Sequence, residues 1–390
     1  MANPPNIDEL IEQMLKRLRG VNTAYIRKIA EQIKKIGELN QSSVNRLVEM
    51  SEMYANINDI NEQLRYVLGM NLGTLQQVYQ LALSEAYTDP RFSAYIAANP
   101  DAIRPQARQR IANYVRYVYR QTAGNMVNLS NTTAITPMYS DAVDRAILAT
   151  STGVASYTET MRQTVREIGT SGMQVTYASG YRRRLDSAVR QNIVDGVNQI
   201  AKNASIMIGE ELGYDAIEIS AHARSAPDHE PVQGRVFKKE QFELMQAGLP
   251  FQDVDGRTYE GFRRPIGEWN CRHTPFSFST EWSKRKWTDE QLQEFADENQ
   301  KGCIINGRHR TLYEAMQMMR SIETQVRREK DAAVAAQAAG DEALQQQCQR
   351  NINTLVAQYS TIAKASGNAE KRQRMTVEGF KPVKVKAAAK

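Results

Sequence analysis

The chain is organised around two runs of residues, S-A-H-A-R-S-A-P-D-H-E-P-V-Q-G-R-V-F at 220–237 and G-E-W-N-C-R-H-T-P-F at 267–276. Together they contain three of the four histidines and one of the three cysteines in the protein, namely His222, His229, His273 and Cys271. Imidazole and thiol groups are common metal ligands and nucleophiles. We therefore expect the candidate chemistry of the chain to lie within these two runs.

The segment around these runs has the pattern of a small α+β module. Residues 216–221 alternate apolar and polar side chains, as a half-buried strand does, and place His222 at the strand's end. Further strands are predicted at 235–237 and 276–279, with a short helix over 240–246. Asp255-Gly256 predicts a hairpin turn between them.

Helical patterns occupy the sequence on both sides of this module. Asn6 can cap the first N-terminal helix, and Ser42 or Ser43 can open the third. Apolar residues recur at helical spacing in six segments, at 7–18, 26–36, 44–48, 57–68, 104–127 and 141–168, the last with a break of small residues near Gly153. Each apolar stripe is narrow, so these helices must pack against one another or against a partner surface.

The C-terminal third is predicted to form a helical hairpin. Apolar residues line one helical face from Leu312 to Val326 and another from Leu344 to Ile362, with Gly340 between the two helices. Thr288 with Gln291, and Thr311 with Glu314, have the spacing of capping boxes.

These patterns predict a mostly α-helical protein with a small α+β module, in which long amphipathic helices flank a central insert of short strands. We divide the chain into five regions. These are a helical N-terminal region (1–130), a connecting region of long helices (131–212), the α+β module (213–287), the helical hairpin (288–363) and a basic flexible tail (364–390).

The formal net charge of +6 is a property of the tail. From Lys364 to Lys390 there are eight Lys or Arg and two Asp or Glu, a balance of +6, so residues 1–363 are formally neutral. Because the tail has no apolar periodicity, we expect it to be flexible and to contact double-stranded DNA through its phosphates. The alternatives are a solubilising extension or a segment that docks on an acidic protein groove. The candidate contact residues are Lys371, Arg372, Arg374, Lys381, Lys384, Lys386 and Lys390.

A second basic cluster precedes a predicted helix. Arg182, Arg183 and Arg184 crowd its start, where positive charge opposes the helix dipole. An acidic protein surface or phosphate groups could neutralise them, and a solvated turn is an equally good interpretation.

The remaining composition indicates a soluble protein of a reducing compartment. Cys271, Cys303 and Cys348 form no paired disulfide framework. No stretch approaches eighteen apolar residues, and the start lacks a basic and hydrophobic leader, so neither a membrane span nor a signal peptide is expected.

The histidines and Cys271 allow several interpretations. His222, His229, Cys271 and His273 could together hold zinc, although C-x-H is not a common zinc spacing. They could instead be hydrogen-bonded side chains that join two loops, without a metal. Enzymatic alternatives are a hydrolase that uses Cys271 as its nucleophile, or a metal-assisted nuclease or peptidase centred on the three histidines. No phosphate loop or dinucleotide motif occurs.

Three motifs in one order carry a family resemblance. S-A-H-x-x-x-x-P-x-H-x-x-x-Q-G-R-V-F, G-x-W-N-C-R-H-x-x-P-F and N-G-R-x-x-T-x-Y-E-A-x-Q resemble the phage minor capsid protein 2 family, which is itself similar to Mu F-type head morphogenesis domains. The resemblance covers roughly 136–377. The family often has a tryptophan before the Q-G pair, where this chain has Val232. The motif residues Gln233, Gly234, Trp269, Asn270 and Arg272 are expected to be structural.

The resemblance implies a structural virion component, not an enzyme, that acts by contacts. It would lie near the portal and head, in several copies per particle, after assembly in the host cytoplasm. Its expected partners are the portal protein, the major capsid protein or both, and packaged DNA, and its expected role is in head assembly or in DNA packaging or ejection.

Overall fold

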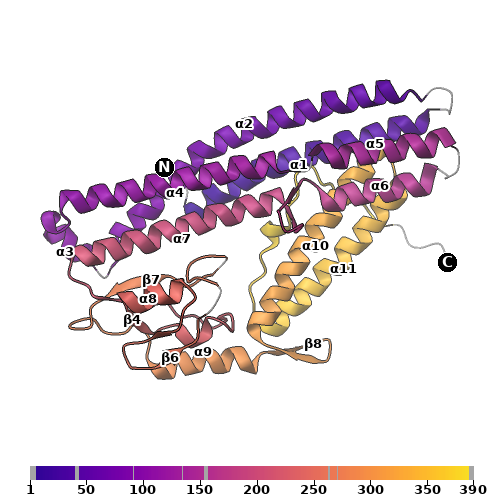
Figure 1. Cartoon of the computed structure of the whole chain (residues 1–390). Helices are drawn as coiled ribbons and strands as arrows, with labels where there is room; N and C mark the ends of the chain where they lie inside the picture. Colours follow the sequence, from indigo (N-terminus) through magenta and orange to yellow (C-terminus); the bar gives the residue numbers. More distant parts are fainter. Residues whose placement is uncertain are drawn as a thin grey trace, which may run out of the picture. The chain divides into compact units, whose positions relative to one another are not determined.

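The computed structural model describes residues 6–39, 44–90, 92–133, 135–152, 157–261, 264–269 and 271–385 (Figure 1). The chain divides into two compact units, each built from three segments. Unit 1 comprises Met1–Glu12, Asn71–Met126 and Arg190–Tyr313, and unit 2 comprises Gln13–Met70, Val127–Val189 and Glu314–Lys390. The five regions proposed from the sequence remain a prediction.

Helices make up most of the described chain, as the periodic apolar stripes predict. None of the described helices is long and apolar enough to cross a membrane. The long helices are α1 (Ile7–Glu38), α2 (Arg46–Tyr87), α4 (Pro105–Asn131), α5 (Ile135–Thr152), α6 (Tyr157–Ser171), α7 (Leu185–Glu211), α10 (Leu312–Ala339) and α11 (Glu342–Ser366). The shorter helices are α3 (Ser93–Ala98), α8 (Lys239–Gln246) and α9 (Asp289–Lys301), with 3-10 turns at Pro100–Ala102, Glu230–Val232 and Arg372–Met375.

The first four of the predicted helical patterns form two helices instead of four. The patterns at 7–18 and 26–36 both belong to α1, because Val21 and Tyr25 between them are buried and continue the stripe. Gly20 lies within this helix, but one glycine costs only about 1 kcal/mol and does not end a helix whose face is covered. The patterns at 44–48 and 57–68 likewise merge in α2.

The caps of these two helices come from asparagine side chains. Asn6 accepts from the Glu9 backbone N–H at 2.9 Å, which is the predicted cap of α1. At α2, Asn45 accepts from the Leu47 backbone N–H at 3.0 Å, while Ser42 and Ser43 lie outside the described residues. At α9 the predicted capping box of Thr288 and Gln291 is present.

The α+β module of unit 1 is a three-stranded antiparallel sheet with β3 (Ala216–Ile219) between β4 (Val236–Lys238) and β7 (Pro275–Phe278). A half-buried β3 was expected, but all four of its residues are buried, because the central strand is covered on both faces. Glu218 is one of them, and its carboxylate accepts from the Lys286 backbone N–H at 2.7 Å. The predicted turn at Asp255-Gly256 joins β5 (Phe251–Gln252) to β6 (Thr258–Tyr259).

Helix α7 covers one face of this sheet, and its backbone lies very close to strand β7. The Ser277 hydroxyl on β7 donates to the Ser205 carbonyl on α7 at 2.7 Å. Gly209, one turn further along α7, has no side chain, and a Cβ there would lie 2.2 Å from Ser277 Oγ. Only glycine therefore allows the helix to approach the strand this closely.

A hairpin that the sequence analysis did not predict precedes α10. β8 (Cys303–Ile305) pairs antiparallel with β9 (Arg308–Arg310). Asn306 and Gly307 connect the strands with positive φ angles of 50° and 72°, which asparagine and glycine adopt more readily than other residues.

The C-terminal helices of unit 2 form the predicted antiparallel hairpin (Figure 1). Glu329 on α10 accepts from the Asn351 side chain at 3.1 Å, and Glu323, earlier on α10, accepts from the Tyr359 hydroxyl at 3.0 Å. The contacts therefore run in opposite directions along the two helices. Gly340 makes the reversal with a φ of 74°.

Unit 2 also contains a buried charge network. β1 (Gln174–Thr176) and β2 (Arg182–Arg184) pair antiparallel. The last residue of β2 is Arg184, which is 6% exposed. Its guanidinium lies 2.7 Å from the Asp331 carboxylate and 3.5 Å from Asp186. Burial alone would raise the pKa of Asp186, but Arg184, Arg327 and Arg19 outweigh burial and lower it. Burial raises the pKa of Asp331 despite Arg184.

This network corrects the prediction for Arg184. Positive charge before α7 needs neutralisation, as expected, but Asp186 and Asp331 of the same chain supply it at Arg184. Arg184 is therefore not available to nucleic acid or to an acidic partner. Arg182 is exposed and Arg183 is partly exposed.

The segment predicted to be a flexible tail is instead packed on unit 2, up to Val385. Lys364 belongs to α11, and Met375 is buried. Hydrogen bonds from side chains of α1, α10 and α11 to backbone carbonyls hold the rest of the segment. They join Lys330 to the Met375 carbonyl at 2.9 Å, Thr23 to the Glu378 carbonyl at 3.2 Å and Gln346 to the Lys384 carbonyl at 2.9 Å. Lys386 and Lys390 lie outside the described residues.

We expect Arg184→Met to lower the free energy of unfolding of unit 2 by about 3–5 kcal/mol, because it leaves two carboxylates buried without this partner. Urea denaturation followed by circular dichroism measures the change. Arg182→Met, in the same strand but exposed, is the matched control and should unfold as the wild type does. The double variant Arg184→Met/Asp331→Leu should recover part of the loss. Equal stability of Arg184→Met and wild type would contradict the assigned role.

Candidate functional site

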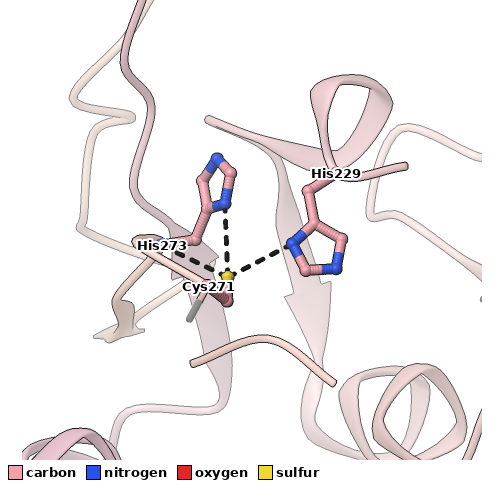
Figure 2. A group of neighbouring side chains, drawn as sticks. All are labelled: His229, Cys271 and His273. Atoms are coloured by element: carbon pink, nitrogen blue, oxygen red, sulfur yellow. Dashed lines mark hydrogen bonds between the residues drawn. The ribbon is translucent and has the colours of Figure 1, made fainter. Parts of the chain in front are cut away.

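The three buried members of the histidine–cysteine set meet between two loops of unit 1 (Figure 2). His229 directly precedes the 3-10 turn at Glu230–Val232, and Cys271 and His273 lie in the loop that enters β7. Their exposed fractions are 0%, 5% and 3%, respectively. Three ligand atoms, one from each residue, all lie within 4.8 Å of one another. We call these residues the His–Cys cluster.

Both imidazole rings direct a nitrogen at the Cys271 sulfur (Figure 2). His229 Nδ1 lies 3.2 Å from Cys271 Sγ, and His273 Nδ1 lies 3.5 Å from it. The backbone N–H of His273 also donates to this sulfur at 3.4 Å. The sulfur is therefore the centre of the cluster.

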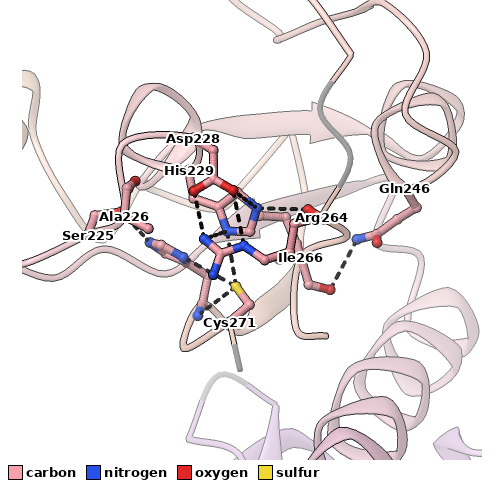
Figure 3. Close-up of polar contacts among 9 residues, drawn as sticks. Ser225, Ala226, Asp228, His229, Gln246, Arg264, Ile266 and Cys271 are labelled. Atoms are coloured by element: carbon pink, nitrogen blue, oxygen red, sulfur yellow. Dashed lines mark hydrogen bonds and ion pairs between the residues drawn. The ribbon is translucent and has the colours of Figure 1, made fainter. Parts of the chain in front are cut away.

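The neighbours of His229 determine which of its nitrogens carries the proton. His229 Nε2 lies 2.8 Å from the Arg264 carbonyl oxygen, which can only accept, so Nε2 is the protonated nitrogen. His229 Nδ1 is therefore left with a lone pair that faces the sulfur. The Arg264 guanidinium pairs with Asp228 through two contacts, of 3.0 and 2.7 Å, and this fixes the carbonyl's position (Figure 3).

The same argument holds for His273. The Gln233 side-chain oxygen accepts from the His222 backbone N–H at 3.1 Å, which fixes the orientation of that amide. The same oxygen lies 3.4 Å from His273 Nε2, and Ser225 Oγ lies 3.3 Å from that nitrogen. Nε2 therefore carries the proton, and Nδ1 presents its lone pair to Cys271.

His222, the fourth predicted metal ligand, is not part of the cluster. Its ring stacks on His273 with centroids 4.6 Å apart. Its Nε2 is buried and has no hydrogen-bond partner. Of the four predicted ligands, the structure thus brings three together and places the fourth against them.

Burial keeps the His–Cys cluster uncharged. It lowers the pKa of His229, and it lowers the pKa of His273 to about 2, with His222 and His229 adding to that effect. Burial also raises the pKa of the Cys271 thiol. Near neutral pH, and without a bound cation, both rings are therefore neutral and the sulfur is a thiol.

The cluster geometry gives no support to the hydrolase interpretation. A cysteine nucleophile reacts as the thiolate and must meet its substrate, but Cys271 is buried and its pKa is raised. A nuclease centre needs an open metal position within reach of a phosphate, whereas all three cluster residues are buried.

The motif residues divide into buried and exposed members. Gln233 is buried against His273, and Gly234 has a φ of 67° with Leu292 packed where a Cβ would lie. Both therefore take part in packing around the cluster loops, and their structural role stays a prediction. Trp269 is exposed, with a φ of 50°, and Arg272 is also exposed. Asn270 lies outside the described residues.

Sequence reasoning missed two residues that hold the cluster in place, Ser225 and Arg264. Ser225 lies within the first quoted run, but no spacing marks it as a partner of His273. Arg264 contributes through its backbone carbonyl, which no side-chain pattern could reveal. Asp228 lies 3.7 Å from His229 Nε2 and pairs with Arg264.

The basic residues predicted to contact DNA or an acidic partner have different environments. Arg372 pairs with Glu370 at 2.6 Å, Arg374 lies 3.7 Å from Glu323, and Lys371 is partly exposed. Lys381 and Lys384 are exposed. Together with Arg182, these two lysines are the exposed members of the set, among the described residues, for which no ion pair is identified.

We expect His273→Ala to lower the free energy of unfolding of unit 1 by about 1–3 kcal/mol, because it leaves the Gln233 and Ser225 groups without this partner. Particle incorporation should fall with stability. Thermal unfolding measures the first effect, and immunoblots of purified particles measure the second. His309→Ala removes an exposed histidine of the same unit and should change neither. An unchanged melting temperature in His273→Ala would show that the cluster does not join the loops.

Comparison with known proteins identifies one family. The family model for phage minor capsid protein 2 matches residues 2–361. The match therefore includes the N-terminal helices, which the motif resemblance at 136–377 did not cover. No curated protein matches the chain, and no solved structure matches it. Because the family model covers nearly the whole chain, this protein belongs to the phage minor capsid protein 2 family.

Proposed function

We propose that this minor capsid protein acts in head assembly, bound at or near the portal and head interior, and that it docks there through an apolar surface at one end of unit 2. The observation that carries the proposal is the exposure of large apolar side chains at the start of α2 and in α5. Leu47 is 81% exposed and Leu148 is 62% exposed, with Val48 exposed beside Leu47. We call these three residues the apolar end.

One ion pair supports the view that the apolar end is continuous. Arg46, next to Leu47, lies 3.0 Å from Asp144, which is one helical turn before Leu148 on α5. Apolar side chains that gather on a surface within a polar rim are typical of protein–protein interfaces. The portal protein and the major capsid protein are the partners that the family assignment makes most relevant.

Contact with packaged DNA is the second part of the proposal, and it rests on Lys381 and Lys384. Both are exposed on the packed C-terminal segment. They would neutralise phosphates by counterion release, without reading the base sequence. We assign the protein no enzymatic activity, because burial separates the His–Cys cluster from any macromolecular substrate.

We expect the double variant Leu47→Glu/Leu148→Glu to fold normally but to be lost from particles, because a charge in an apolar interface is costly to desolvate. The gene is replaced in the phage, and the copy number per particle is measured by immunoblotting. Leu249→Glu changes an exposed leucine of unit 1 and should be incorporated as the wild type is. Wild-type incorporation of the double variant would place the capsid contact on another surface.

We expect the purified protein to bind duplex DNA weakly and with a strong dependence on salt. Lys381→Ala/Lys384→Ala should bind more weakly and should reduce the slope of log K against log salt by about 0.9 for each lysine. Gel shifts at several salt concentrations test this. Lys284→Ala/Lys301→Ala removes the same charge from unit 1 and should leave the slope unchanged. Equal slopes for all three proteins would remove the C-terminal segment from the DNA contact.

A further inference from the structure

We propose that His229, Cys271 and His273 bind a structural zinc ion through His229 Nδ1, Cys271 Sγ and His273 Nδ1. This inference is independent of the proposed function, since it concerns how unit 1 is held together. Two imidazoles and a thiolate are a ligand set that zinc prefers, whereas magnesium and calcium prefer oxygen ligands.

The distances from the Cys271 sulfur to the two imidazole nitrogens fit tetrahedral coordination. Zinc bonds of about 2.0–2.1 Å to nitrogen and 2.3 Å to sulfur, at tetrahedral angles, put neighbouring N and S donors about 3.6 Å apart. The observed separations from Cys271 Sγ are 3.2 Å for His229 Nδ1 and 3.5 Å for His273 Nδ1. Small side-chain movements would therefore be enough to admit the ion.

The protonation of the two histidine rings leaves the nitrogens that face the sulfur able to bind a cation. Both Nδ1 atoms present lone pairs to the sulfur, because each Nε2 proton is already directed to an oxygen acceptor. A thiol has a single proton and can donate to only one of the two rings. The Arg264 guanidinium reaches His229 Nδ1 only at 3.5 Å, while its contact with Asp228 is 2.7 Å. A zinc ion would satisfy both lone pairs and the sulfur together.

The hydrogen bonds around the three donor atoms are those found around the ligands of metal sites. Ligating histidines usually donate their second N–H to a carbonyl or carboxylate, which orients the ring. His229 donates to the Arg264 carbonyl at 2.8 Å, and His273 is held by Gln233 and Ser225. The backbone N–H of His273 donates to the sulfur and would stabilise a thiolate. The proposal assigns no bond to His222, whose ring stacks on His273.

The test is metal analysis of full-length protein expressed in zinc-supplemented medium and purified without chelators. We expect about one zinc per chain by mass spectrometry of metals, since the three ligands are buried. Cys271→Ser, His229→Ala and His273→Ala should each lose most of the zinc. His309→Ala and Cys303→Ser remove the same residue types elsewhere in unit 1 and should retain it.

A second measurement keeps the test valid if a cluster variant fails to fold. Wild-type protein is stripped with a chelator, checked for helix content by circular dichroism and titrated with Co²⁺. A thiolate-to-cobalt charge-transfer band should appear, zinc should displace it, and either metal should raise the melting temperature. Less than one-tenth of an equivalent of zinc, together with no cobalt band, would overturn the proposal in favour of a cluster held by hydrogen bonds alone.

Discussion

The architecture depends on covering the narrow apolar stripes of very long helices. A helix of 32 residues such as α1 has one covered face, and Met14, Ile26 and Ile33 along it are fully buried. Helices with such stripes are stable only when the stripe is covered, because propensity alone contributes little. This requirement explains why α1 and α2 continue without a break where local sequence suggested separate helices, and why each compact unit is assembled from three distant segments.

The sequence predicted those parts of the fold that depend on local patterns. The stripes of α10 and α11, the reversal at Gly340 and the strands that became β3, β4 and β7 all follow from residue spacing. The β8–β9 hairpin was also signalled, since Asn306-Gly307 is a strong turn signal, but its flanking strands are too short to show alternation. Missed features depended on distant partners. Arg184 is buried because Asp331, far along the chain, neutralises it, and the basic segment is packed up to Val385 because α1, α10 and α11 supply hydrogen-bond partners.

In the candidate site, too, the sequence predicted what depends on residue type and position, and missed what depends on three-dimensional packing. Residue type and position were enough to select His229, Cys271 and His273 as a group, although 42 residues separate His229 from Cys271. The exclusion of His222 could not be predicted, because it depends on how its ring stacks on His273. Nor could the sequence show that the group is buried, and burial is the property that distinguishes a structural centre from a catalytic one.

The packing of the C-terminal segment has a consequence for biosynthesis. Thr23 and Arg27 of α1 contact the carbonyls of Glu378 and Gly379, so residues that are synthesised early bind residues that are synthesised more than 350 positions later. Domains fold as units as the chain emerges from the ribosome, but unit 2 lacks part of its structure until Glu378 and Gly379 have been synthesised. Chains that end before these residues would therefore present an incomplete unit 2, and the folding of this unit itself would discriminate against such fragments before any copy enters a particle.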